Sequence, residues 1–298
     1  MENRDENSLI PQFLLEVLQK LADVSSLDWL AARAKKIAVE EKKTTLFLSF
    51  SQASRFFTKD GLSLEDSQLK RAKALKADWR PETWNQLNAA RAYLVLHLPH
   101  ADSTKWLKTL DQLFETGDMN ELESLYKTLC LYPHQELLAP RAAEGLRSNM
   151  TIVFDAVALN NPYPAAHLNE TAWNQLVLKA IFLQRPLYQI IGLDERANAH
   201  LADTLLDAAN ERWSAHRSVM PELWRLVGPF IHDENIQMIK KLLSQDNPLE
   251  VQAGVLACLS SSHPEAQQLV NEHVSIKEEI DRGNVSWESI GRQYVPFQ

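Results

Sequence analysis

The stretch that decides the fold is residues 233–259, which read DENIQMIKKLLSQDNPLEVQAGVLACL. Apolar residues recur at helical spacing from Ile236 to Leu243, and the pattern resumes after Asn247-Pro248 and continues to Leu259. Two helices of about ten to twelve residues joined by an Asn-Pro turn are typical of HEAT-like repeats. A helix pair with one apolar face cannot bury that face alone, so we expect it to stack on neighbouring pairs.

Residues typical of helix starts recur along the whole chain. Ile10-Pro11 opens an apolar run at helical spacing, Pro81 suits the first turn of a helix, and Asp118 with Glu121 has capping-box spacing. Glycine supplies only 8 of 298 residues, which leaves little material for tight hairpins or bulges. The sequence therefore predicts an all-α fold: a right-handed stack of antiparallel helix pairs, a HEAT-like α-solenoid, with no significant β-sheet.

Three regions follow from the helix pattern and the charge. Residues 1–110 form an N-terminal helical region with a basic surface, because residues 29–108 hold 15 lysines and arginines against 8 acidic residues. Residues 111–275 carry the helical repeats, and residues 276–298 form a peripheral C-terminal helix and a tail. Two stretches look irregular: we expect a mobile connection in 44–68 and a long polar loop in 157–170.

The sequence also bears on where the protein works. Met1–Ser8 is acidic and polar, unlike a secretory signal, and no apolar run approaches the ~20 residues of a membrane span. Cys130 and Cys258 lie far apart, which favours a reducing compartment. A net charge of −8 argues against nucleic-acid binding. We therefore expect a cytoplasmic protein whose contact with a membrane is at most peripheral.

Sequence motifs for phosphate, dinucleotide or metal binding are missing. No G-x-G-x-x-G, no G-x-x-x-x-G-K-[ST] and no H-E-x-x-H occurs in the chain. We therefore expect neither a cofactor nor a bound metal, and we assign no catalytic residue.

Arginines and tryptophans gather between Arg141 and Phe230. Together they can form a concave site for an aromatic or anionic ligand through stacking and bidentate hydrogen bonds. The same residues can equally be ion pairs and core aromatics where helices cross, so both interpretations stay open. The candidate ligand- or partner-binding residues are Arg141, Arg147, Asn149, Asn161, His167, Trp173, Asn174, Lys179, Asp194, Arg196, Asn198, Arg212, Trp224 and Arg225.

The same part of the chain resembles a known family, the EboA family. The resemblance covers about residues 120–260. Six runs carry it: RAAEGLRSNM (141–150), ALNNPYP (158–164), AWNQLVLK (172–179), GLDERAN (192–198), ERW (211–213) and PELWRLVGPF (221–230).

This resemblance implies a role but no mechanism. EboA-type proteins accompany other Ebo proteins, among them a membrane prenyltransferase-like member. The set is associated with moving secondary metabolites, or their precursors, towards the periplasm. The family has no established catalytic activity, so the resemblance marks positions and assigns no residue a chemical role.

Three hypotheses of different classes follow. The first is a non-enzymatic helical-repeat adaptor that binds a small aromatic or isoprenoid metabolite, or a partner Ebo protein, with its arginines gripping a polar group between tryptophan walls. The second is an enzyme of the same pathway that acts on a small aromatic or prenylated molecule, with His167, Asp194 or Glu195 as acid or base. The third is a scaffold that recruits pathway enzymes to the membrane through the basic 29–108 surface.

Overall fold

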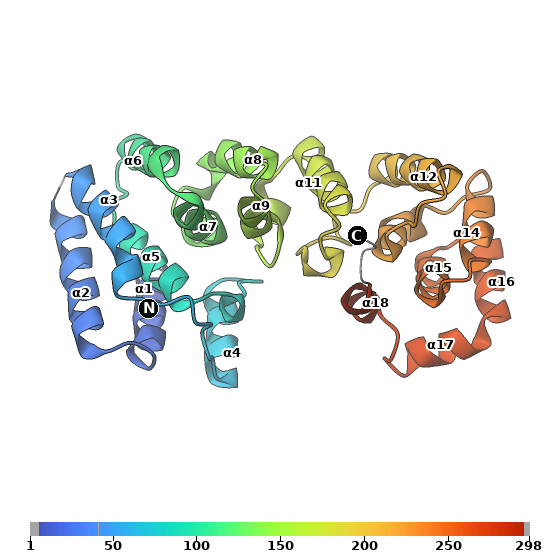
Figure 1. Ribbon diagram of the computed structural model, residues 1–298, viewed down its shortest axis with the longest axis horizontal. Coiled ribbons are helices and arrows are strands. Elements are labelled where there is room, and N and C mark those ends of the chain that lie inside the picture. Colours follow the sequence, from blue (N-terminus) through green and yellow to red (C-terminus); the bar gives the residue numbers. More distant parts are fainter. Residues whose placement is uncertain (1–5, 41, 295–298) are drawn as a thin grey trace, which may run out of the picture. The chain divides into compact units, whose positions relative to one another are not determined.

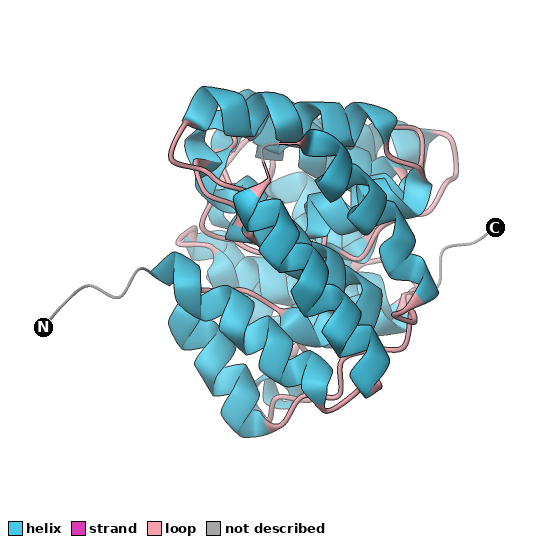
Figure 2. Ribbon diagram, turned by 90° about the vertical axis from the view of Figure 1, so that its left-hand side faces the viewer, coloured by secondary structure: helices cyan, strands magenta, loops and turns pink. Residues whose placement is uncertain are grey.

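The chain folds into helices joined by turns and loops. A computed structural model describes residues 6–40 and 42–294. Within these residues the regular structure is helical (Figure 2). One isolated antiparallel bridge joins Gly61 to Asn85. The predicted all-α fold is therefore confirmed. The chain divides into two compact units, residues 1–169 and 170–298.

The first unit contains ten α-helices within its described residues and four short 3-10 turns (Figure 1). The α-helices are α1 Glu6–Gln19, α2 Val24–Val39, α3 Lys43–Gln52, α4 Asp66–Leu75, α5 Gln86–Leu96, α6 Ser103–Thr116, α7 Met119–Lys127, α8 Ala139–Arg147, α9 Thr151–Ala158 and α10 Tyr163–His167. The 3-10 turns are η1 Ala53–Arg55, η2 Pro81–Thr83, η3 Leu129–Leu131 and η4 Gln135–Leu137.

Helix α5 lies at the centre of this unit. Every residue from Gln86 to Val95 is buried, because α1, α2, α3 and α7 all pack against this helix. A helix that is buried on all sides needs no amphipathic stripe, and the alanines of α5 let its neighbours approach closely. Farther along the chain, α9 packs between α7 and α8.

The second unit contains eight α-helices within its described residues and three 3-10 turns. The α-helices are α11 Glu170–Phe182, α12 Ala199–Ser214, α13 Trp224–Val227, α14 Ile236–Leu243, α15 Pro248–Ser260, α16 Pro264–Glu272, α17 Val274–Asp281 and α18 Trp287–Gln293. The 3-10 turns are η5 Leu187–Gln189, η6 Pro221–Leu223 and η7 Gly228–Phe230. Helix α15 is the central one, because α13, α14, α16, α17 and α18 all contact it.

Most of the predicted helix signals operate as expected. Asp118 and Glu121 form a capping box at the start of α7, and the Asn247 side chain accepts a hydrogen bond from the backbone N–H of Leu249 at the start of α15. Two starts differ. Helix α1 begins before Pro11, and Pro81 opens the 3-10 turn η2, while α5 itself is capped by Asn85.

Of the two expected irregular stretches, the long polar loop at 157–170 is wrong. Most of 157–170 is helical, in the end of α9, in α10 and in the start of α11, because Pro162 and Pro164 lie where a helix start needs no N–H donor. The stretch 44–68 holds most of α3, the turn η1 and the start of α4, and residues 56–65 form a connection without helix between them, whose mobility stays a prediction. Threonine lowers helix propensity only slightly, and burial of Leu46 and Phe50 outweighs that cost.

Some expectations stay predictions. These are the right-handed stacking of helix pairs and the regions 1–110, 111–275 and 276–298. Residues 1–5 and 295–298, with most of Met1–Ser8 and the end of the tail, lie outside the described residues, as does residue 41. Each helix in the described part of the chain is too short or too polar to cross a membrane.

Candidate functional site

Arg141 is held by carboxylates of its own unit. Its guanidinium forms ion pairs with Asp111 at 2.6 Å, Glu144 at 2.7 Å and Glu115 at 3.3 Å. The same group lies over the ring of Phe114, with 5.6 Å between the guanidinium carbon and the ring centroid. These contacts fix α8 against α6.

The other candidates of the first unit differ in exposure. The buried Asn161 amide donates hydrogen bonds to the backbone oxygens of Tyr126 and Ala156, each at 3.0 Å, and so holds the turn between α9 and α10. His167 hydrogen-bonds the Gln135 side chain at 3.0 Å, and burial lowers the pKa of its imidazole. Arg147 and Asn149 lie exposed at the end of α8.

Two candidate pairs come together in the second unit. The guanidinium carbon of Arg196 lies 4.7 Å from the ring centroid of Trp173, which is fully buried, and burial lowers the pKa of Arg196. The Asn198 amide donates to the Asn174 carbonyl at 2.9 Å, and Asn198 also caps α12. Both contacts fasten the turn before α12 to α11.

The remaining candidates of this unit also make contacts within it. Asp194 forms a bidentate ion pair with Arg225, and Arg212 donates to the backbone oxygen of Ser218 at 2.6 Å. The fully buried Trp224 ring stacks on Trp213, with the centroids 5.3 Å apart. Burial lowers the pKa of the half-buried Lys179. The assignment of these residues to a binding site stays a prediction.

A largely apolar hollow lies elsewhere, in the first unit. It has a volume of about 290 Å³ and lies between the end of α2, the start of α3, the loop after α5 and the start of α6. We call it the α2–α6 groove. Its apolar lining comes from Ile37, Val39, Leu46, Leu98, Pro99 and Trp106.

Polar side chains surround this apolar lining. They are Glu40, Lys42, Lys43, Asp102 and Lys105. Both carboxylates already have partners: Glu40 accepts from the Thr45 hydroxyl at 2.7 Å, and Asp102 caps α6 by accepting from the backbone N–H of Lys105 at 3.0 Å. The rim therefore carries three lysines and two carboxylates, and the carboxylates are held in place by hydroxyl and backbone donors.

The groove is hard to recognise from the sequence alone. Ile37, Leu46 and Trp106 belong to three different helices, and their apolar faces look like ordinary core positions. The one available signal is the excess of basic residues in 29–108. It predicts a basic surface but does not indicate a pocket.

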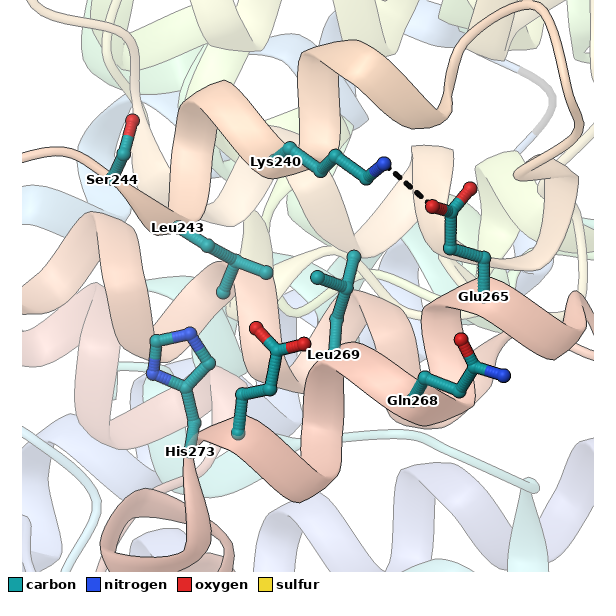
Figure 3. A pocket seen from close by; sticks show the side chains of 8 residues that line it. Lys240, Leu243, Ser244, Glu265, Gln268, Leu269 and His273 are labelled. Atoms are coloured by element: carbon teal, nitrogen blue, oxygen red, sulfur yellow. Dashed lines mark ion pairs between the residues drawn. The ribbon is translucent and has the colours of Figure 1, made fainter.

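A second hollow lies between α14 and α16 (Figure 3). It has a volume of about 400 Å³, with Leu243 and Leu269 as its apolar part and Ser244, Gln268 and His273 around them. At its edge the Lys240 ammonium group forms an ion pair with the Glu265 carboxylate at 2.5 Å, which the dashed line in Figure 3 marks. Its polar lining and its own ion pair make this groove a poorer site for an apolar ligand.

A third hollow, of about 430 Å³, has a buried carboxyl group in its wall. Glu222 is fully buried and accepts hydrogen bonds from the backbone N–H groups of Leu187 at 3.2 Å and Tyr188 at 2.6 Å. Burial raises its pKa to about 7, against the effect of these hydrogen bonds. Sequence reasoning missed Glu222, since a glutamate in the run PELWR carries no sign of burial.

The described part of the chain contains no evident metal site and no reactive thiol. No group of three or more His, Cys, Asp or Glu side chains there could hold a metal ion. Cys130 and Cys258 are buried, and burial raises the pKa of each thiol to about 12. A thiol with such a pKa is a poor nucleophile at neutral pH.

Comparison with known proteins adds one finding. A family model described as "Metabolite traffic protein EboA" matches residues 10–228. The match starts well before the 120–260 stretch of the resemblance, so it includes the whole α2–α6 groove and also Glu222, but neither the α14–α16 hollow nor α18. No curated protein and no solved structure matches the chain.

Proposed function

The chain belongs to the EboA family of metabolite traffic proteins, and we propose that it serves this traffic by binding a small, largely apolar metabolite in the α2–α6 groove. In this proposal the protein is a non-enzymatic adaptor in the cytoplasm. It supports movement of a secondary metabolite or its precursor towards the periplasm and passes the ligand to another Ebo protein.

The observation that supports this proposal most is the composition of the groove wall. Binding sites for small molecules are concave and mostly apolar, with a few polar groups that orient the ligand. The α2–α6 groove combines these properties, because Ile37, Leu46 and Trp106 line it and lysines stand at its rim. Each methylene group that a ligand buries there contributes roughly 0.8 kcal/mol to binding.

The groove also lies in the part of the chain that matches the family model. Residues 37–109, which contribute its lining, fall within the matched residues 10–228. The acid–base alternative gains less support from the contacts of its named residues. His167 is hydrogen-bonded to Gln135, and Asp194 is engaged by Arg225.

A groove-filling substitution tests this proposal. Ala38 is exposed and lines the groove near the end of α2, so Ala38→Trp places an indole in the ligand's space without disturbing the core. Ala31 is exposed on the same helix, about two turns earlier, and does not line the groove. Ala31→Trp is therefore the matched control.

The measurement is native mass spectrometry of the three proteins purified from the natural host. We expect a small molecule to accompany the wild type and Ala31→Trp but not Ala38→Trp. A molecule that stays with Ala38→Trp would place its site elsewhere. Wild-type protein that carries no small molecule would count against the binding function itself.

A further inference from the structure

We infer that the ligand of the α2–α6 groove is an amphipathic anion: an apolar body that ends in a carboxylate or phosphate group. This inference rests on the proposed function, because it specifies the chemistry of the molecule that the groove binds. It starts from the position of the lysines and from what each of them contacts.

Lys42 and Lys43 stand together where α3 begins, at the rim of the groove. The Lys42 side chain is exposed and forms no ion pair with a described residue. Lys43 donates a hydrogen bond to the Gln112 side-chain oxygen at 3.0 Å, which is a neutral partner. Neither ammonium group therefore forms an ion pair with a carboxylate in the described part of the chain.

The surroundings add to this positive potential. Lys42 occupies the N-cap position of α3, and no side chain of a described residue caps this helix, so the positive end of the helix dipole lies beside the two lysines. Lys105 lines the groove from α6, so the described lining holds three lysines against the two carboxylates of Glu40 and Asp102 and keeps an excess of positive charge. Summed charges of this kind attract an anion to the rim.

The groove thus has two chemically distinct parts. Its apolar lining, from Ile37, Leu46, Leu98 and Trp106, suits a chain or ring system. Its rim at Lys42 and Lys43 suits a negative group that can stay partly hydrated. A ligand with both features binds in one orientation, with its apolar body inside and its anionic end at α3.

Three probes with a ten-carbon chain and different head groups test this chemistry. They are decanoate and decyltrimethylammonium, each used below its micelle-forming concentration, and decanol, used below its solubility limit. Isothermal titration calorimetry of the full chain measures their dissociation constants. We expect decanoate to bind about tenfold more tightly than decanol, because two exposed lysines together contribute about 1.4 kcal/mol. The cationic probe should bind more weakly than decanol.

A charge substitution separates the head from the tail. Lys42→Gln with Lys43→Gln should weaken decanoate to the affinity of decanol and leave decanol unchanged. The matched control, Lys35→Gln with Lys36→Gln, removes two exposed lysines that do not line the groove, and decanoate should keep its affinity. Increasing salt should reduce the advantage of decanoate in the wild type.

The outcomes distinguish the inference from the proposed function. If decanoate and decanol bind equally and Ala38→Trp prevents both, the ligand needs no anionic group, while the groove remains its binding site. If decyltrimethylammonium binds most tightly of the three probes, the inferred anionic group is also wrong. If no probe binds, the groove itself fails as a site. Binding to vesicles of anionic phospholipid without binding of free decanoate would show that the lysines contact a membrane surface, which also overturns the inference.

Discussion

Asp194 and Arg225 bind each other through two parallel hydrogen bonds, from Nε to Oδ1 at 2.5 Å and from Nη2 to Oδ2 at 2.6 Å. This bidentate geometry ties the segment before α12 to α13. The sequence makes each residue a candidate ligand contact, yet in the structure the charged groups of the two residues pair with each other. The Asp194 side chain is 57% exposed, so solvent screens the pair.

A double-mutant cycle measures what this pair contributes to stability. Asp194→Asn, Arg225→Gln and the double variant should give a coupling energy of about 1 kcal/mol or less, because the pair is partly exposed. Urea unfolding supplies the free energies. A coupling energy several times larger would show that the pair is shielded from solvent.

Arg91 should matter far more to stability. It is 2% exposed and donates hydrogen bonds to the backbone oxygens of Asn120 at 2.8 Å and Phe50 at 3.2 Å, with the Glu121 carboxylate 3.8 Å away. Arg91→Met removes these hydrogen bonds and leaves the buried Glu121 carboxylate without its cation, although the Asp118 backbone N–H still donates to it. We expect a loss of about 3 kcal/mol or more in the free energy of unfolding.

Arg33→Met is the control for this substitution. Arg33 lies on α2 over the Trp29 ring, where its guanidinium stays partly in water. Its replacement should cost about 0.5–1 kcal/mol. Equal losses for Arg33→Met and Arg91→Met in urea unfolding would contradict the role of Arg91 as a buried link between α3, α5 and α7.

The raised pKa of Glu222 should make the free energy of unfolding depend on pH. Its folded pKa of about 7 lies above the ordinary 4.5, so the folded chain holds this proton more tightly than the unfolded chain between these values. The contribution of the protonated group is complete below pH 4.5 and is lost as the pH rises to about 7. The loss is on the order of 3 kcal/mol.

Glu222→Gln should remove this slope, because an amide does not titrate. The measurement is the free energy of unfolding in urea at several pH values from 4.5 to 8. Glu234→Gln changes an exposed glutamate and should leave the slope in place. A wild-type curve that rises through this range after subtraction of the Glu222→Gln curve would contradict the assignment.

Helix α18 should be sensitive to one added methyl group. A Cβ at Gly291 would overlap the ring of Tyr188 and lie 2.7 Å from the carboxyl carbon of Glu222. Gly291→Ala should therefore destabilise the second unit by about 1–3 kcal/mol. Hydrogen exchange of α18 amides measures this directly. At Gly61 a Cβ would meet only the Trp84 oxygen at 4.0 Å, so Gly61→Ala should have little effect.

Local signals predicted much of the fold. The capping box of Asp118 with Glu121 and the Asn247-Pro248 turn depend on residues within one helix start, so the sequence alone reveals them. The expected loop at 157–170 was wrong because polar residues and prolines there serve a helix start. Asn161, for example, accepts a hydrogen bond from the backbone N–H of Tyr163 at 3.0 Å.

The candidate sites depended on tertiary structure, which the sequence did not show. Tryptophan neighbours arginine in Trp224-Arg225, but only packing decides that the indole is fully buried while the guanidinium meets Asp194. Glu222 and the α2–α6 groove were missed for the same reason. Their character comes from residues far apart in the sequence, such as Leu46 and Trp106, that meet only after folding.

A crystal structure of the protein with decanoate bound tests the central claim most directly. The account predicts a tail between Leu46, Leu98 and Trp106, with the carboxylate at Lys42 and Lys43. An empty α2–α6 groove beside a ligand seated elsewhere on the chain would contradict it.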